Sequence, residues 1–287
     1  MILIHDPRCA DYGSSARPEQ PARIVETVKF FRDAYPSWIW KTPPENVPDE
    51  ILRLAHTQSH IARLDQPRDF DPDTPYFPGI AAHARRSVAA ALHASTEAFR
   101  DRRPVFSLMR PPGHHATPGF AMGFCYLNQI AISALAARSL LGAQRVAVWD
   151  FDAHHGNGTE DILHGREGFL FCSMHQSPCY PGTGRRNRGN CLNWPIQPGA
   201  PREEHMAAIR QSLDAVCAFN PDLVLVSAGF DAYAEDPITE MALEIDDFAM
   251  LGKWLKETGI PAAAVLEGGY SSDLPRLVGA FLEYWDA

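Results

Sequence analysis

Segments that resemble strands alternate with segments that resemble helices from residue 80 onward. The strand-like segments are PVFSLM (104–109), RVAVW (145–149), FLFCSM (169–174), LVLVSAG (223–229) and AAAVLEGG (262–269). The helix-like segments are 80–99, 125–142, 202–219, 245–259 and 274–285. Strands that are apolar along their whole length are buried on both faces. The order therefore predicts an α/β protein with a mostly parallel central sheet and helices on both faces.

The size and composition of the chain favour one large domain. Of the 287 residues, 45% are hydrophobic, which is enough for an extensive core. Two Pro-rich stretches, 41–48 and 65–79, are too short to be convincing interdomain linkers and are expected to be loops. We therefore expect a single domain over residues 1–287.

Charge and cysteine usage narrow the class of protein. The formal net charge of −9 argues against a nucleic-acid or membrane-surface partner, because both require a basic face. No apolar run approaches the roughly 20 residues of a membrane span, and MILIHDPRCADYG lacks the pattern of a signal peptide. The six cysteines form no CxxC pair, which is typical of reduced thiols. A cytoplasmic protein is expected.

Residues able to do chemistry follow four of the predicted strands. Ligands of parallel sheets bind beyond the carboxyl ends of the strands, which meet at one edge. The residues at these ends are His114 and His115 after 104–109, Asp150, Asp152, His154 and His155 after 145–149, Asp231 after 223–229, and Tyr270 after 262–269. We therefore expect these side chains to gather at one site.

Three of these residues form a plausible metal-binding set. Asp152 and His154 are two positions apart in an extended segment, so their side chains point to the same side, and Asp231 would add a third ligand. Two carboxylates and one imidazole suit Zn²⁺, Fe²⁺ or a similar ion with a coordination position left open for catalysis. For any one of them alone, the alternative is an ordinary hydrogen-bonded loop residue.

Motifs along nearly the whole chain resemble those of the zinc-dependent histone deacetylase superfamily, which includes bacterial acetylpolyamine amidohydrolases. The matching segments are RPEQPARI (17–24), AHTQSHI (55–61), RPPGHHA (110–116), GFCYLN (123–128), DFDAHHGNGT (150–159), PGTG (181–184), AGFDAYAEDP (228–237) and LEGGY (266–270). The resemblance implies the arginase-deacetylase fold and removal of acetyl or other short acyl groups from a small N-acylated amine or an acyl-lysine. A homo-oligomer is compatible with it.

The resemblance also implies roles for residues at the strand ends. Asp152, His154 and Asp231 would bind one Zn²⁺, and Tyr270 would polarise the scissile carbonyl. His114 and His115 would be the tandem active-site histidines, with His115 acting first as general base and then as general acid. Asp150 would orient His114, and Asn157 would partner His115. A neutral Asn stabilises an imidazolium less than Asp does, so we predict a mostly neutral His115 at physiological pH.

A substrate tunnel and a second cation are implied as well. Gly123 would accept the substrate amide N–H through its carbonyl, with Phe124 and Tyr180 as tunnel walls and Ile238 near the mouth. Some polyamine-selective members carry Glu at the position of Ile238, so we expect limited discrimination between acyl-lysines and acetylpolyamines. A structural K⁺ or Na⁺ would lie near Asp150, Asp152, His154, Ser173 and Met174.

Two alternatives share the fold or the site. An arginase-like hydrolase with two Mn²⁺ ions needs further bridging carboxylates, but Gly156 and Tyr233 stand where two of them would fall. A catalytically idle acyl-group-binding protein would keep the pocket without turnover. A dinucleotide-binding site is disfavoured because no GxGxxG pattern follows a first strand.

Several polar residues are expected to have structural roles. His56 and His60, four residues apart, could form a helical metal pair, but packing or capping is the favoured interpretation. His83 and His93 are expected on a surface helix, and Arg185, Arg186 and Arg188 in a solvated loop. For His155, a packed and hydrogen-bonded position is the default expectation.

Overall fold

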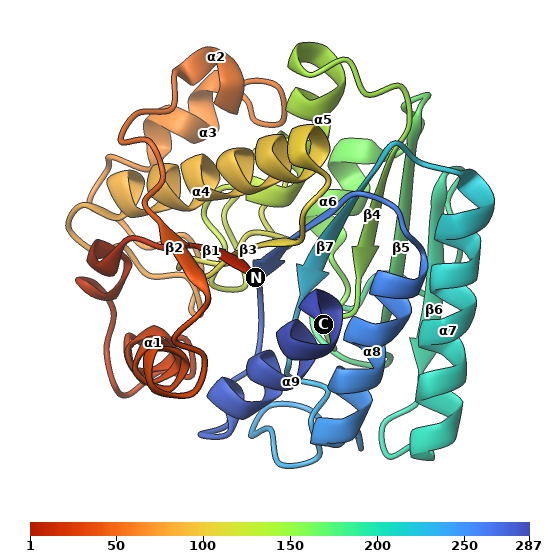
Figure 1. Cartoon of the computed structure of the whole chain (residues 1–287). Coiled ribbons are helices and arrows are strands. Elements are labelled where there is room, and N and C mark those ends of the chain that lie inside the picture. The colour runs from red at the N-terminus through yellow and green to blue at the C-terminus, as the bar shows by residue number, and fades with distance from the viewer.

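The strands form one parallel sheet, seen in a computed structural model that describes all residues from 1 to 287 (Figure 1). They are β1 (Ile2–Ile4), β2 (Ile39–Lys41), β3 (Val105–Ser107), β4 (Val146–Asp150), β5 (Phe169–Gln176), β6 (Cys191–Ile196), β7 (Leu223–Ala228) and β8 (Ala262–Leu266). Their order is β2-β1-β3-β8-β7-β4-β5-β6, and every pairing is parallel. The predicted fold class is confirmed, with no antiparallel strand in the sheet.

Helices cover both faces of the sheet. They are α1 (Ala22–Ala34), α2 (Asp49–Leu52), α3 (Gln58–Arg63), α4 (Ile80–Asp101), α5 (Gln129–Leu140), α6 (Asn157–Leu163), α7 (Arg202–Phe219), α8 (Ile245–Glu257) and α9 (Leu274–Asp286), together with the short 3₁₀ helix η1 (Pro7–Ala10). In Figure 1, α4 and α5 lie on one side of the sheet, whereas α1, α7, α8 and α9 lie on the other. No helix combines the length and the apolar character needed to cross a bilayer.

The central strands are buried because their side chains are apolar on both faces. All residues of β4, β5, β7 and β8 are buried, and one hydrophobic core joins them to the covering helices. β6 lies at an edge of the sheet, and its buried residues alternate with partly exposed ones. Pro195 fits this edge position, because proline cannot donate a hydrogen bond in the middle of a sheet.

The helices and strands predicted from the sequence are all present, but the prediction missed several others. The strands β1 and β2 have only three residues each, too few for a recognisable pattern. Helix α6 begins at Asn157, within a segment whose Gly156, Asn157 and Gly158 are typical of a loop. Its first turn is stabilised by a tertiary hydrogen bond from Thr159 N–H to the His114 carbonyl at 3.1 Å, which local propensity does not report.

The strand order explains how distant segments meet. The strands β3, β8, β7 and β4 are consecutive in the sheet although they are far apart in the sequence. Since all four are parallel, their carboxyl ends lie side by side at the same edge. The four chemistry-bearing segments that follow them therefore converge.

Candidate active site

Asp152, His154 and Asp231 converge at the carboxyl ends of β4 and β7. Each offers a ligand atom, and these atoms lie within 4.8 Å of one another in a buried position. His154 Nδ1 is 2.8 Å from Asp231 Oδ2 and 3.3 Å from Asp152 Oδ1. Backbone N–H groups of Gly268 and Ala153 donate to the outer carboxylate oxygens at 2.7 and 2.8 Å, which orients both carboxylates. The three residues predicted as metal ligands are thus brought together.

The charge of this cluster favours a cation. Burial opposes a charge on His154, but the carboxylates of Asp231 and Asp152 outweigh it and hold the pKa of the imidazole well above its usual range. A positive charge at Nδ1 is therefore strongly favoured by the two carboxylates. A divalent ion among the same three atoms would satisfy this demand, and the donor set of two oxygens and one nitrogen suits Zn²⁺.

A second convergent set, His114, Cys125 and Glu267, suits a metal less well. Glu267 Oε2 already accepts from the backbone N–H groups of Gly113 and His114, at 2.7 and 3.2 Å. Burial raises the pKa of the Cys125 thiol well above its usual range, so it stays protonated and is a poor metal ligand. Glu267 instead holds the backbone of the tandem histidines in place, a role that the sequence did not reveal.

The tandem histidines have different partners. His114 Nδ1 is 3.1 Å from Asp150 Oδ2, whereas His115 Nδ1 is 2.8 Å from Asn157 Oδ1. Since an amide oxygen only accepts, His115 Nδ1 carries the proton of this hydrogen bond. Its Nε2 is then the unprotonated nitrogen. Both pairings match those that the sequence predicted.

The pKa values of the two histidines are shifted in opposite directions. Burial opposes charge on His114, but the carboxylates of Asp152 and Asp150 outweigh it and raise its pKa to about 10. Burial, together with the neighbouring His114 and His154, lowers the pKa of His115 well below its usual range. One histidine is therefore cationic and the other is a neutral base at physiological pH.

Tyr270 lies at the same cavity as His115 and His154, and Asp236 and Arg23 hold it in position. Its backbone N–H donates to Asp236 Oδ2 at 2.7 Å, and the guanidinium carbon of Arg23 lies 4.8 Å from its ring centroid. Arg23 also donates to the carbonyl of Gly269 at 2.7 Å. Burial raises the pKa of the phenol well above its usual range, so the hydroxyl remains a hydrogen-bond donor. Arg23 and Asp236 lie within segments that the sequence singled out, but their supporting roles depend on contacts between distant segments.

A cavity of about 280 Å³ leads to these groups. It is lined by Arg17, Pro18, Asp73, His115, Gly123, Phe124, His154, Cys179, Tyr180, Ile238 and Tyr270. The four residues predicted to bind substrate are all among them. Gly123 has φ +56°, and a Cβ there would lie 2.6 Å from the His115 ring and 2.9 Å from Tyr180. Only glycine allows the backbone this close to the base.

The remaining residues predicted near the metal lie behind the cavity. Asp150 and Ser173 are opposite each other in the register of β4 and β5, and Met174 follows in the same buried strand. His155 does not line the cavity and is buried, with Nδ1 2.7 Å from Thr183 Oγ1 and Nε2 3.3 Å from a Glu160 carboxylate oxygen. The default expectation for His155, a packed and hydrogen-bonded position, is confirmed.

The histidines assigned structural roles are mostly as expected. His56 and His60 are buried and bond to the backbone of Thr117, Asn128 and Tyr126, which confirms packing over metal binding. The surface position expected for His83 is wrong. Helix α4 packs between the sheet and neighbouring elements, so His83 is buried against the Tyr12 ring at a centroid distance of 4.8 Å.

The arginines after PGTG lie in an exposed loop, as expected. Arg185, Arg186 and Arg188 are all exposed. Arg188 is not free, because it forms ion pairs with Glu160 at 2.9 Å and Asp161 at 3.4 Å.

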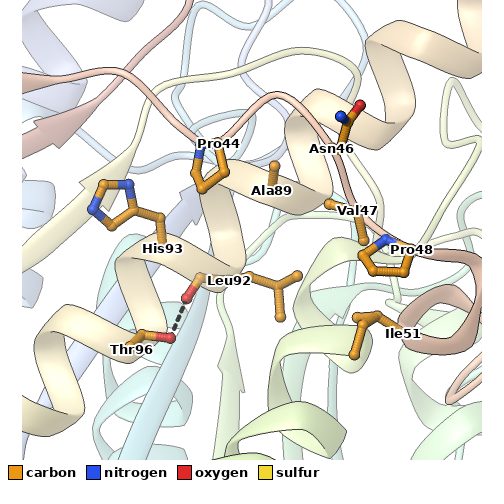
Figure 2. Close-up of a pocket in the computed structure, with 9 residues that line it drawn as sticks. All are labelled: Pro44, Asn46, Val47, Pro48, Ile51, Ala89, Leu92, His93 and Thr96. Atoms are coloured by element: carbon orange, nitrogen blue, oxygen red, sulfur yellow. Dashed lines mark hydrogen bonds between the residues drawn. The ribbon is translucent and has the colours of Figure 1, made fainter.

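A second cavity of similar volume, about 290 Å³, lies between the loop around Pro44 and helix α4 (Figure 2). Its lining residues are Pro44, Asn46, Val47, Pro48, Ile51, Ala89, Leu92, His93 and Thr96. The Thr96 hydroxyl is used by its own helix, where it donates to the Leu92 carbonyl at 2.7 Å. Its only titratable lining residue is His93, whose Nε2 lies 3.6 Å from a Glu97 carboxylate oxygen. Neither set of converging ligands lies here, so the first cavity is the better candidate for a metal-assisted reaction.

Comparisons with known proteins agree with this geometry. The family model described as histone deacetylase domain matches residues 17–284. A probable deacetylase of Methanothermobacter thermautotrophicus is 36% identical, over 95% of this chain and 86% of its own. Acetylpolyamine amidohydrolase 2 of Pseudomonas aeruginosa is 32% identical, over 88% of this chain and 78% of its own. The crystal structure of the HDA15 HD domain superposes with a TM-score of 0.93 at 29% identity, covering 99% of this chain and 90% of that one.

Fold, strand-end chemistry and relatives thus agree, as the sequence motifs predicted. The match to the family model extends over most of the chain, and both relatives are matched along most of their own length. The chain belongs to the histone deacetylase and acetylpolyamine amidohydrolase superfamily, and it is a hydrolase of the amide-deacetylating type.

Proposed function

We propose that this protein is a zinc-dependent amidohydrolase that removes acetyl or other short acyl groups from N-acylated amines such as acetyl-lysine or acetylpolyamines. The observation that carries the proposal is a cluster of three potential ligands, one of which, His154, lines the same cavity as a neutral histidine and a protonated tyrosine. Metal-assisted amide hydrolysis requires this combination, because an amide is a poor electrophile and water a poor nucleophile.

Zinc would be held by Asp152, His154 and Asp231. When bound, it would supply Lewis acidity that polarises the scissile carbonyl and lowers the pKa of water towards about 7. A monovalent cation, K⁺ or Na⁺, is proposed behind this site near Asp150, Asp152, His154, Ser173 and Met174. The alignment of Asp150 with Ser173 across β4 and β5 supports that placement.

His115 would transfer the protons. Its Nε2 is free to accept, since Nδ1 donates to Asn157. Accepting a proton from the attacking water and returning it to the leaving amine requires a base that is neutral before the reaction, and burial keeps His115 neutral. His114, paired with Asp150, lies beside it and would stabilise negative charge that develops on the substrate.

Tyr270 and Gly123 would bind the two ends of the scissile amide. The Tyr270 hydroxyl would donate to the carbonyl oxygen as charge develops there, a contribution of roughly 3 kcal/mol if it behaves as other oxyanion donors do. The Gly123 carbonyl would accept the amide N–H. Phe124 and Tyr180 would enclose the alkyl chain of the substrate.

The dinuclear manganese alternative is disfavoured at Gly156. A Cβ at this position would lie 2.2 Å from Asp150 Oδ2 and 3.3 Å from His114 Nδ1. The site therefore has no room for the aspartate that a second metal would need. Tyr233, the other substituted position, donates to Asp273 at 3.3 Å.

Metal titration tests the proposal and separates it from the catalytically idle alternative. Metal-free protein would be titrated with Zn²⁺ and assayed with an acetyl-lysine fluorogenic amide, and bound metal would be counted by elemental analysis. We expect activity to saturate at one zinc per chain. Tyr270→Phe should keep the zinc and lose about 10²- to 10³-fold in kcat. Stoichiometric zinc without turnover of any acyl amine would identify an idle binding protein, and saturation at two metals would contradict the mononuclear site.

A further inference from the structure

The mouth of the catalytic cavity carries two opposite charges, from Arg17 and Asp73, that the proposed chemistry does not use. Both residues line the same cavity as His115 and Tyr270. They come from distant segments, Arg17 from the stretch before α1 and Asp73 from the loop that precedes α4. Neither was predicted as a site residue.

Neither charge is neutralised by the protein. Arg17 forms no ion pair, and its only side-chain hydrogen bond is from Nη1 to the Pro72 carbonyl at 3.0 Å. This bond leaves most of the guanidinium N–H groups free and fixes Arg17 against the loop that carries Asp73. The Asp73 carboxylate has no ion pair and accepts no hydrogen bond, while its backbone N–H donates to Asp71 Oδ1 at 3.0 Å. Both side chains are therefore available to a ligand.

The walls between this mouth and the base are apolar or aromatic. Phe124, Tyr180 and Ile238 line the cavity there. Asp73 lines the same cavity as Tyr180, so its carboxylate lies at the wall that would enclose the substrate chain. A suitable substrate would have an amide at one end, a flexible alkyl chain in the middle, and both a carboxylate and an ammonium at the other end.

We propose that the enzyme acts on diamino acids that are acylated on the side-chain nitrogen and keep a free α-ammonium and a free α-carboxylate. Free Nε-acetyl-lysine is an example. Arg17 binds the α-carboxylate and Asp73 binds the α-ammonium. An acetylated diamine offers an ammonium to Asp73 but no carboxylate to Arg17, whose positive charge is then left unpaired near the ammonium. An acyl-lysine inside a peptide has neither charge. This inference rests on the proposed amide hydrolysis and specifies its substrate class.

Three small substrates isolate the two charges. Nε-Acetyl-lysine carries both, N-acetylcadaverine lacks only the carboxylate, and 6-acetamidohexanoate lacks only the ammonium. An acetyl-lysine peptide serves as the uncharged reference. We expect kcat/KM for Nε-acetyl-lysine to exceed that of each truncated analogue about five- to tenfold, the size of one partly exposed charge-assisted contact. The advantage should shrink at high salt.

Two variants assign each charge to its residue. Arg17→Gln should abolish the preference for Nε-acetyl-lysine over N-acetylcadaverine and leave the preference over 6-acetamidohexanoate. Asp73→Asn should do the reverse. Arg68→Gln is the matched control. Arg68 is an exposed arginine in the loop 65–79, which also carries Asp73, but Arg68 does not line the cavity. Equilibrium binding of the three compounds to the zinc-loaded Tyr270→Phe variant, which should turn them over slowly, can be measured by calorimetry and should show the same order.

The outcomes separate this inference from the proposed function. If all substrates are hydrolysed and kcat/KM for N-acetylcadaverine equals or exceeds that for Nε-acetyl-lysine, the proposed roles of Arg17 and Asp73 are wrong, whereas the proposed amidohydrolase activity stands. Equal changes of substrate preference in Arg17→Gln and Arg68→Gln would likewise contradict the role of Arg17 alone. Absence of hydrolysis for every compound, the peptide included, would overturn the proposed function. Calorimetry would still decide whether Arg17 and Asp73 distinguish the ligands.

Discussion

Of the pairs of buried histidines in this protein, His56–His60 and His114–His115 are the most alike, and only the second belongs to the candidate active-site cavity. His56 and His60 contact each other with ring centroids 4.8 Å apart, and His114 and His115 do so at 4.0 Å. All four side chains are buried. By residue type, burial and ring contact the two pairs are nearly the same.

Their hydrogen-bond partners differ. In the first pair, His56 Nδ1 donates to the Thr117 carbonyl at 3.0 Å, and its Nε2 accepts from the Asn128 N–H at 2.9 Å. His60 bonds to the Tyr126 carbonyl at 2.8 Å. With both nitrogens of His56 bonded to fixed backbone groups, it has no nitrogen left to accept a proton from a substrate.

The second pair has side-chain partners and keeps one nitrogen of His115 free. A carboxylate supports His114, an amide supports His115, and the cavity lies in front of them. The comparison shows that partner and access decide the role of a buried histidine, whereas burial alone lowers the pKa at both His56 and His115. The comparison would be wrong if mutation of His56 mainly lowered activity and mutation of His115 mainly lowered stability.

The largest effect is expected at the base. His115→Ala should lower kcat by about 10³-fold, within the range for loss of a general acid–base group, because no other neutral histidine faces the cavity with a free nitrogen. The zinc content should stay at one per chain, since His115 is not among the three ligands. Steady-state kinetics with elemental analysis measures both, and a variant that keeps near-normal kcat would remove His115 from the mechanism.

The reverse pattern is expected at His56. His56→Ala should lower the free energy of unfolding by about 3 kcal/mol, because it opens a cavity and leaves the Asn128 N–H and the Thr117 carbonyl without a partner. Under native conditions kcat should remain within about threefold, far from the factor expected at His115. Urea denaturation monitored by fluorescence gives the stability. His56→Gln, which retains a donor and an acceptor, should lose less, and an equal loss in both variants would contradict the hydrogen-bond argument.

The pH dependence of stability should also reveal the lowered pKa of His56 in the first pair. Burial, together with the neighbouring His60, lowers the pKa of His56 to about 3, against a value near 6.5 in the unfolded chain. The unfolded state therefore binds more protons between these values. Stability is fully present above pH 6.5 and is lost as the pH falls towards 3, by about 2–3 kcal/mol from this group by pH 4. Denaturation series at pH 7, 5.5 and 4 should show a shallower slope in His56→Ala than in the unmodified protein.

The smallest effect is expected at Asn157, the hydrogen-bond partner of His115 in the second pair. Asn157→Asp places a carboxylate against His115 Nδ1, which should stabilise the imidazolium and move the acidic limb of the kcat/KM profile upward by about one pH unit. Asn46→Asp adds the same charge at the second cavity and should leave the limb in place (Figure 2). An unmoved limb in Asn157→Asp would show that Asn157 does not tune the base.

Much of the site could be predicted from the sequence because its residues follow apolar strands. Strands β4, β7 and β8 are apolar along their length, so their ends were identifiable, and Asp152, Asp231 and Tyr270 follow from the rule that parallel strands end at one edge. The pairing of His115 with Asn157 was implied by the resemblance and is present.

The groups that support and surround the site required the tertiary structure. Glu267 binds the backbone of the tandem histidines across 153 and 154 residues of sequence, and Arg23 reaches Gly269 across 246. The helix at Asn157 begins against a local pattern typical of a loop.

The sequence by itself determined the class of fold and placed the proposed ligand set, through residue type and strand periodicity, whereas the proposed base followed from the family resemblance. Only the tertiary structure supplied the hydrogen-bond partners that distinguish the two histidine pairs, and only it showed that Arg17 and Asp73 line one cavity. The physical reason is that a polar side chain takes its role from its partners. Partners brought together by the order of strands in the sheet leave no local pattern in the chain.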